Sequence, residues 1–219
     1  MREMVIRVTR ECDGCNFEKI NFDLQPALRP TDKPKFPFDG WSIDLITNLD
    51  PISPEGYRHC VVAVCCFSKW CEIMPIKNKT SDTLATWFHT NIVCRYGKPR
   101  WVRVDSGREF MGEFGKLCQG LGVTVRKTSA MHPRSNGQVE RFNKEIKIAI
   151  RKYCGLHPGT SWFDWIPDVL CGLRMLVAKS HGYSPYFLVY KQSPILPGRP
   201  MEVSEEHPIS LDTDPWMEG

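Results

Sequence analysis

The sequence predicts an α/β domain, with a mixed five-stranded sheet flanked by helices. Early in the chain, three strand-like runs follow one another closely, which is typical of an antiparallel meander. After them, strand-like and helix-like runs alternate, which favours parallel strand pairing through crossover connections. The composition agrees with a globular fold, because 42% of the 219 residues are hydrophobic and 11% are aromatic. Wholesale disorder is therefore excluded.

The expected elements follow in chain order. Strands are predicted over residues 40–47, 59–67 and 70–76. Thr80-Ser81-Asp82 then offers N-cap chemistry for a helix that should end at Tyr96-Gly97-Lys98-Pro99. A strand at 100–104, a short helix at 113–120 and a strand at 123–128 come next. After a loop at 129–136, helices are predicted at 137–153 and 162–178, the second of which is apolar enough to serve as core or as a contact surface.

Length and charge predict one core with appendages. A chain of 219 residues suits a single domain, and we divide it into an N-terminal piece (1–20), a Pro-rich linker (21–38), the core (39–195) and an acidic tail (196–219). Residues 201–219 hold six acids and no Lys or Arg, so 29 bases face 19 acids in the first 200 residues. A basic body suits a polyanionic partner. The ten cysteines are scattered, which predicts reduced thiols in a cytosolic or nuclear protein. No signal peptide or long apolar run indicates a membrane location.

Three carboxylates are candidates for chemistry. Asp44 interrupts an apolar strand, where a charge is costly to bury unless it is paired or bound to metal. Asp105 ends a strand and precedes Ser106-Gly107, at the carboxyl edge that sites in such sheets favour. Taken singly, either aspartate could instead form a turn or an ion pair.

Glu140 begins a charged stripe on the predicted long helix. An apolar stripe of Val139, Phe142, Ile146, Ala149 and Tyr153 has the spacing to pack on the sheet. Glu140, Lys144, Lys147 and Arg151 recur along another face. Either these are ordinary Glu–Lys pairs on a solvated helix, or a metal ligand heads a track of phosphate contacts.

Six motifs stand in order along the chain: Trp41-Ser42-Ile43-Asp44, Phe67-Ser68-Lys69-Trp70, Tyr96-Gly97-Lys98-Pro99, Asp105-Ser106-Gly107-Arg108-Glu109-Phe110, His132-Pro133-Arg134-Ser135-Asn136-Gly137-Gln138-Val139-Glu140-Arg141-Phe142-Asn143 and Gly182-Tyr183-Ser184-Pro185-Tyr186. Together they resemble the integrase core of long-terminal-repeat retrotransposons of the Gypsy class and their retroviral relatives. The resemblance implies a ribonuclease-H-like fold in which the Asp44 strand lies beside the Asp105 strand and the Glu140 helix covers them.

The resemblance also implies an activity. Asp44, Asp105 and Glu140 would be the catalytic residues and the ligands of two Mg²⁺ or Mn²⁺ ions, with Asp44 bridging them. The reactions would be DNA 3′-end processing and strand transfer, with element ends and target DNA as partners of a homo-oligomer. DNA contacts are expected from Lys144, Lys147, Arg151, Arg134 and Asn136. The site of action would be the nucleus, which the protein would enter from a cytoplasmic particle.

Departures from the family pattern leave other interpretations open. Cys12 and Cys15 have the spacing of half a zinc site, but the two upstream histidines of the family pattern are absent here. We expect a remnant of the zinc-binding domain rather than a filled site. Cys65-Cys66 stands where relatives have Asp, and Lys191 where they have Gly. An acidic end replaces a basic module, so a domesticated or degenerate core that binds DNA or protein without catalysis is the alternative. A hydrolytic nuclease of the same fold is disfavoured by the Gly182-Tyr183-Ser184-Pro185 motif.

Overall fold

The computed structural model describes residues 33–127, 133–178 and 180–195, with the backbone alone over 133–141. The chain divides into two units, residues 1–33 and 34–219, and the fold below belongs to the second. Cys12, Cys15 and the acidic tail lie outside the described residues, so the predicted zinc remnant and the four-part division stay predictions. No described helix combines the length and the hydrophobicity that a membrane span requires.

A five-stranded mixed sheet forms the centre of the fold, as the sequence predicted. Its order is β3-β2-β1-β4-β5. The first three strands pair antiparallel, whereas β1–β4 and β4–β5 are parallel pairs. The strands are β1 (Gly40–Ile46), β2 (His59–Cys65), β3 (Cys71–Ile76), β4 (Trp101–Val104) and β5 (Thr124–Lys127).

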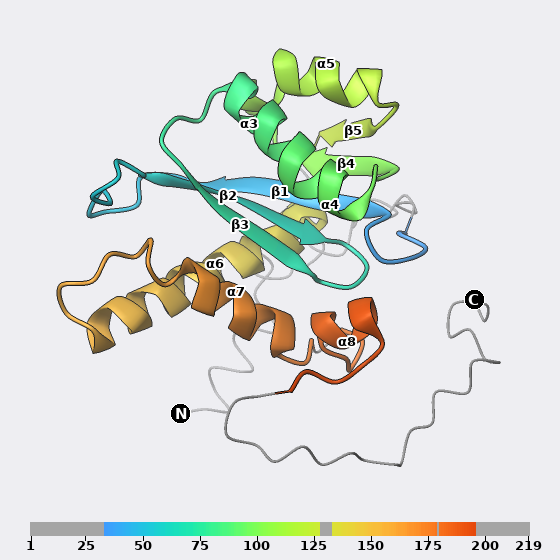
Figure 1. Ribbon diagram of the computed structural model, residues 1–219. Helices are drawn as coiled ribbons and strands as arrows, with labels where there is room; N and C mark the ends of the chain where they lie inside the picture. Colours follow the sequence, from blue (N-terminus) through green and yellow to red (C-terminus); the bar gives the residue numbers. More distant parts are fainter. Residues whose placement is uncertain (1–32, 128–132, 179, 196–219) are drawn as a thin grey trace, which may run out of the picture. The chain divides into compact units, whose positions relative to one another are not determined.

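Helices cover both faces of the sheet (Figure 1). All seven residues of β2 are buried, because its alternate side chains enter two separate cores. Val61 and Ala63 join the core under the first helical layer, while Val62 and Val64 join the core on the other face. A strand buried on both faces reads as a continuous apolar run, and this explains the Cys-Val-Val-Ala-Val-Cys sequence of β2.

The first helical layer lies between β3 and β5 in the chain. As predicted, the Thr80 side chain caps the helix that follows by accepting from the amide of Thr83. That helix is one run to Tyr96, but its middle turn is π-helical. The elements are α3 (Ser81–Phe88), the π segment η1 (His89–Val93), α4 (Cys94–Tyr96), the 3₁₀ turn η2 (Arg108–Phe110) and α5 (Glu113–Gly120).

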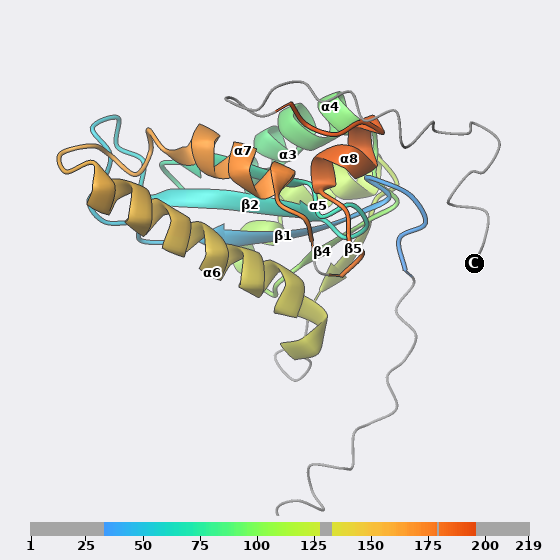
Figure 2. The same ribbon diagram turned by 90° about the horizontal axis from the view of Figure 1, so that it is seen from below.

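The second layer contains α6 (Pro133–Leu156), α7 (Ile166–Met175) and α8 (Pro185–Tyr190). α6 crosses beneath β1 and β2, and α7 packs on β3 (Figure 2). Two helix starts were predicted wrongly, and the two helices end at Leu156 and Met175 rather than at residues 153 and 178. Pro133 to Asn136 are helical rather than part of a loop, since Pro is well suited to a first helical position. The helix predicted from Trp162 starts only at Ile166, with Pro167 in its first turn. Trp162 lies before the helix, and its indole donates to the Pro51 carbonyl at 2.8 Å.

Two of the departures from the family pattern, at Cys65-Cys66 and at Lys191, lie in the described residues. The Cys65 sulfur accepts hydrogen bonds from the amides of Phe38 (3.2 Å) and Ser68 (3.4 Å). A side-chain acceptor is therefore kept at this turn without a carboxylate. Lys191 ends α8 in the left-handed conformation, with φ 57° and ψ 25°. Glycine adopts that conformation without steric cost, whereas a lysine there is strained.

Candidate active site

Asp44 lies on the sheet face that α6 covers. Its neighbour Ile43 enters the core of the first layer, whereas Ile46 enters the core beneath α6, and side chains alternate along a strand. The Asp44 carboxylate is half-buried. It accepts from the Leu45 amide at 2.8 Å and from the side-chain amide of Asn143 at 2.6 Å. β1 therefore presents Asp44 to a polar group of α6.

Strand pairing brings Asp105 beside Asp44. The last paired residues of β1 and β4 are Ser42 and Arg103, and Asp44 and Asp105 lie two residues further along. Because neighbouring strands are about 4.8 Å apart, the two carboxylates belong to one edge of the sheet. The Asp105 carboxylate accepts from the Gly107 amide at 2.9 Å, which fixes its orientation.

The backbone of Glu140 lies near this pair. α6 packs on β1, and Asn143, which contacts Asp44, is three residues after Glu140 in the same helix. Positions three apart share a helix face and are separated by about 4.5 Å along the axis. The Glu140 side chain lies outside the described residues, as do those of Arg134 and Asn136. The topology thus brings three segments together, with two of the three carboxylates described.

Asn143 and Glu109 take part in the site, and our sequence reasoning assigned a role to neither. No donor among the described residues reaches the buried Oδ1 of Asn143. A Cβ on Gly107 would lie 2.7 Å from the Glu109 carboxyl and 2.9 Å from Asp105 Oδ1, so Glu109 adds negative charge beside Asp105. Both residues fall inside the quoted motifs, and Asn143 follows Glu140 at helical spacing, which is the signal that could have identified it.

The donor set suits a hard divalent cation. Two carboxylates and an unsatisfied amide oxygen are the oxygen ligands or water-binding groups that Mg²⁺ and Mn²⁺ favour over softer metals. Within the ranges whose side chains are described, no three His, Cys, Asp or Glu residues gather closely enough to hold a metal. Glu140, the third predicted metal ligand, lies outside those ranges.

The rest of the predicted helix pattern is confirmed where it is described. Ile146 and Ile150 are buried beneath the sheet, with Phe142, Ala149 and Tyr153 packed against the same core. Lys144, Lys147 and Arg151 are exposed. The cation row therefore lies on the solvent side of α6, where it is accessible to a polyanion.

Comparison with known proteins identifies the family. The integrase core domain matches residues 34–133. The Pro-Pol polyprotein of simian foamy virus type 3 is 29% identical over 216 residues, which are 96% of this chain and 18% of the viral protein. The Pol polyprotein from transposon 412 of Drosophila melanogaster is 26% identical over 198 residues, covering 90% of this chain and 16% of that protein. The chain thus spans less than a fifth of the length of these relatives.

Solved structures show the same fold. The HTLV-2 integrase catalytic core in complex with magnesium, in a trimeric form, is similar with a TM-score of 0.57 and 24% identity, over 70% of this chain and 97% of that one. Its dimeric form gives a TM-score of 0.56 and 23% identity, with the same coverage. The expected ribonuclease-H-like fold is therefore confirmed. Residues 34–133 thus match an integrase core domain, and the homologues of the chain are the integrases of retroviral and retrotransposon Pol polyproteins.

Proposed function

We propose that this chain is the catalytic core of a retroelement integrase, which trims the 3′ ends of element DNA and joins them to target DNA. The observation that supports it most is the strand pairing that sets Asp44 beside Asp105, next to the helix that bears Glu140. These are the three acids that match the family motif. Their retention and the similarity to Pol polyproteins favour this function over that of a degenerate core without catalysis.

Asp44, Asp105 and Glu140 would hold two Mg²⁺ or Mn²⁺ ions. When bound, such a pair activates an oxygen nucleophile and stabilises charge on the phosphate that reacts. Magnesium in the similar HTLV-2 core supports this assignment. The chain's own part is to position the ligands: Asn143 holds one oxygen of Asp44, and the Gly107 amide holds one of Asp105. Each hydrogen bond limits the rotation of a carboxylate and so preserves the geometry that two metals require.

The exposed cations of α6 would bind the DNA backbone. Lys144, Lys147 and Arg151 follow Glu140 along the helix, so a strand whose reacting phosphate lies at Glu140 could continue along them. Arg134 and Asn136 lie in the first turn of the same helix. The enzyme would act as a homo-oligomer, as the trimeric and dimeric forms of the HTLV-2 core suggest by analogy. Its place of action would be the nucleus, after transport in a cytoplasmic particle.

An assay of the reverse of strand transfer tests the proposal. The substrate is a branched DNA that resembles the product of strand transfer, because reversal of the reaction needs the same carboxylates and no knowledge of the element's terminal sequence. With Mg²⁺ or Mn²⁺, the protein should resolve the branch into two duplexes. Asp44→Asn and Glu140→Gln should each reduce the rate by more than about 100-fold, since loss of even an outer-shell partner of a metal ligand typically costs 10–100-fold.

Glu145→Gln is the matched control, because Glu145 is an exposed acid on the same helix. It should retain the rate of the parent. A parent protein that is folded by circular dichroism yet resolves no branched DNA would reject the enzymatic function in favour of the degenerate core. Equal activity of Glu140→Gln and Glu145→Gln would reject the assignment of Glu140 as a metal ligand.

A further inference from the structure

Two arginines lie side by side on the sheet face that carries the carboxylates. Arg103 of β4 pairs in register with Arg126 of β5, so both side chains point to the same face. Val102 and Val104 enter the core of the first layer, and Arg103 therefore points to the opposite face. Asp105 follows Arg103 by two residues, which corresponds to about 6.6 Å along an extended strand.

A buried indole supports both guanidinium groups. The Arg103 and Arg126 guanidinium carbons lie 5.3 and 4.4 Å from the ring centroid of Trp101, which is within the range of cation–π attraction. Trp101 is only 1% exposed. Its ring lies against Gly40, where an added Cβ would come within 2.3 Å of the indole. The ring is thus held between the β1 backbone and the two arginines, so the pair is ordered before any ligand binds.

Further positive charge lies at the neighbouring hairpin. The Lys69 ammonium donates to the Cys66 carbonyl at 2.7 Å. Burial lowers the pKa of Lys69, and the positive charge of Arg103 acts in the same direction. Burial also raises the pKa of Cys66 to about 12 against the influence of Arg103, Lys69 and Arg126. The thiol therefore stays neutral near neutral pH and does not repel an anion.

We propose that Arg103 and Arg126 together bind one phosphate of the DNA strand, next to the phosphate that reacts at Asp105. The guanidinium group presents a planar fork of donors that suits the oxygens of a phosphate. This site lies on β4 and β5, apart from the cation row of α6. It rests on the proposed function, because the ligand is the substrate of the same active site.

Metal-free DNA binding tests the site separately from catalysis. The probe is a short blunt DNA duplex, titrated with the full 219-residue chain at several salt concentrations. The double variant Arg103→Gln/Arg126→Gln should bind more than about tenfold more weakly, because the phosphate loses its charge-assisted hydrogen bonds to both guanidinium groups. The slope of log Kd against log salt should fall by about 1, as expected when one phosphate contact is lost.

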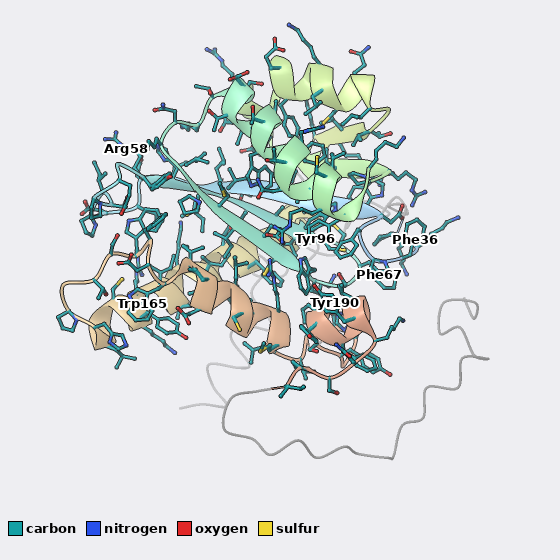
Figure 3. The ribbon with its side chains drawn as sticks, in the orientation of Figure 1. Phe36, Arg58, Phe67, Tyr96, Trp165 and Tyr190 are labelled. Carbon is teal, nitrogen blue, oxygen red and sulfur yellow. The ribbon has the colours of Figure 1, made fainter. Side chains whose placement is uncertain are left out.

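Two further double variants separate the loss of net charge from the loss of the guanidinium groups. Arg58→Gln/Lys116→Gln removes the same net charge elsewhere, because Arg58 lies at the far end of the sheet from Phe67 and Tyr96 (Figure 3) and Lys116 lies on α5. This control should bind the DNA duplex more tightly than Arg103→Gln/Arg126→Gln does. Arg103→Lys/Arg126→Lys keeps the charge but loses the fork, so its salt slope should match the parent while its affinity falls about tenfold.

The outcomes separate this inference from the proposed function. Parent-like affinity and salt slope in the Arg103→Gln/Arg126→Gln protein, or a loss no larger than that of the Arg58→Gln/Lys116→Gln control, would overturn the phosphate site. A folded parent that binds DNA through this pair but resolves no branched DNA would overturn the enzymatic function alone.

Discussion

At the scale of single residues, Gly107 has no room for a side chain. An added Cβ would lie 2.9 Å from Asp105 Oδ1 and 2.7 Å from the Glu109 carboxyl. Gly107→Ala should therefore displace the Asp105 carboxylate and reduce the rate of branched-DNA resolution on the order of 100-fold, because small misplacements of catalytic groups have such effects. Gly120→Ala on α5 has open space around its Cβ and should keep the parent's rate. Equal rates for the two variants would show that Asp105 needs no such positioning.

His59 makes stability depend on pH. It is 7% exposed, and its Nδ1 accepts from the Asn48 amide at 3.2 Å. Burial, followed by the charges of Lys79 and Arg58, lowers its pKa below the usual 6.5. The unfolded chain therefore binds a proton that the folded chain resists, so this contribution is present above pH 6.5 and is lost as the pH falls towards the folded-state pKa.

Urea unfolding at about pH 7.5 and about pH 5.5 tests this, because the two values lie on either side of the ordinary histidine pKa. The parent should lose more unfolding free energy on acidification than His59→Gln does. The exposed His89 provides the control: His89→Gln should lose as much as the parent. An identical loss in all three proteins would show that His59 does not contribute.

At the scale of elements, Glu72 joins the two helical layers at the edge of the sheet. It is a buried residue of β3, and it forms ion pairs with Arg95 of α4 at 3.0 Å and Arg174 of α7 at 2.7 Å. The Tyr96 hydroxyl also donates to it. Burial and this bond raise the pKa of Tyr96, which keeps the hydroxyl protonated as a donor.

Glu72→Ala should lower the free energy of unfolding by about 2–3 kcal/mol, because it leaves the partly buried Arg174 and the Tyr96 hydroxyl without their shared acceptor. Glu113→Ala is the control. Its pair with Lys116 on α5 is exposed, so the loss should stay below about 1 kcal/mol. Chemical denaturation measures both, and similar losses would mean that the Glu72 network does not connect the layers.

Elements with local signals were predictable from the sequence, and those set by tertiary contacts were not. The cap was predicted within Thr80-Ser81-Asp82 and is Thr80, and the Glu113–Gly120 helix was predicted to the residue. α8 was missed, although Ser184 caps it and Pro185 begins it, because six residues give too little periodicity to recognise. The π segment at His89–Val93 was missed because its apolar spacing resembles that of an ordinary helix.

At the scale of the whole molecule, the site depends on contacts between distant segments. The residues of the Asp44–Asp105 edge were identified by motif, and their meeting depends on the parallel pairing of β1 and β4, which alternation of strands and helices predicted only in outline. The Glu72 network was not predicted, because its partners lie 23 and 102 residues away and their sequence neighbourhoods carry no shared pattern.

The central claim is that Asp44, Asp105 and Glu140 meet around a pair of divalent cations. Anomalous diffraction from crystals grown with Mn²⁺ measures this most directly. We expect manganese peaks about 2.0–2.2 Å from carboxylate oxygens of Asp44 and Asp105, with Glu140 as a further ligand of the second ion. Both peaks should be lost in Asp44→Asn. Ordered side chains with Glu140 directed away from the two aspartates, and no manganese peak at this edge of the sheet, would contradict it.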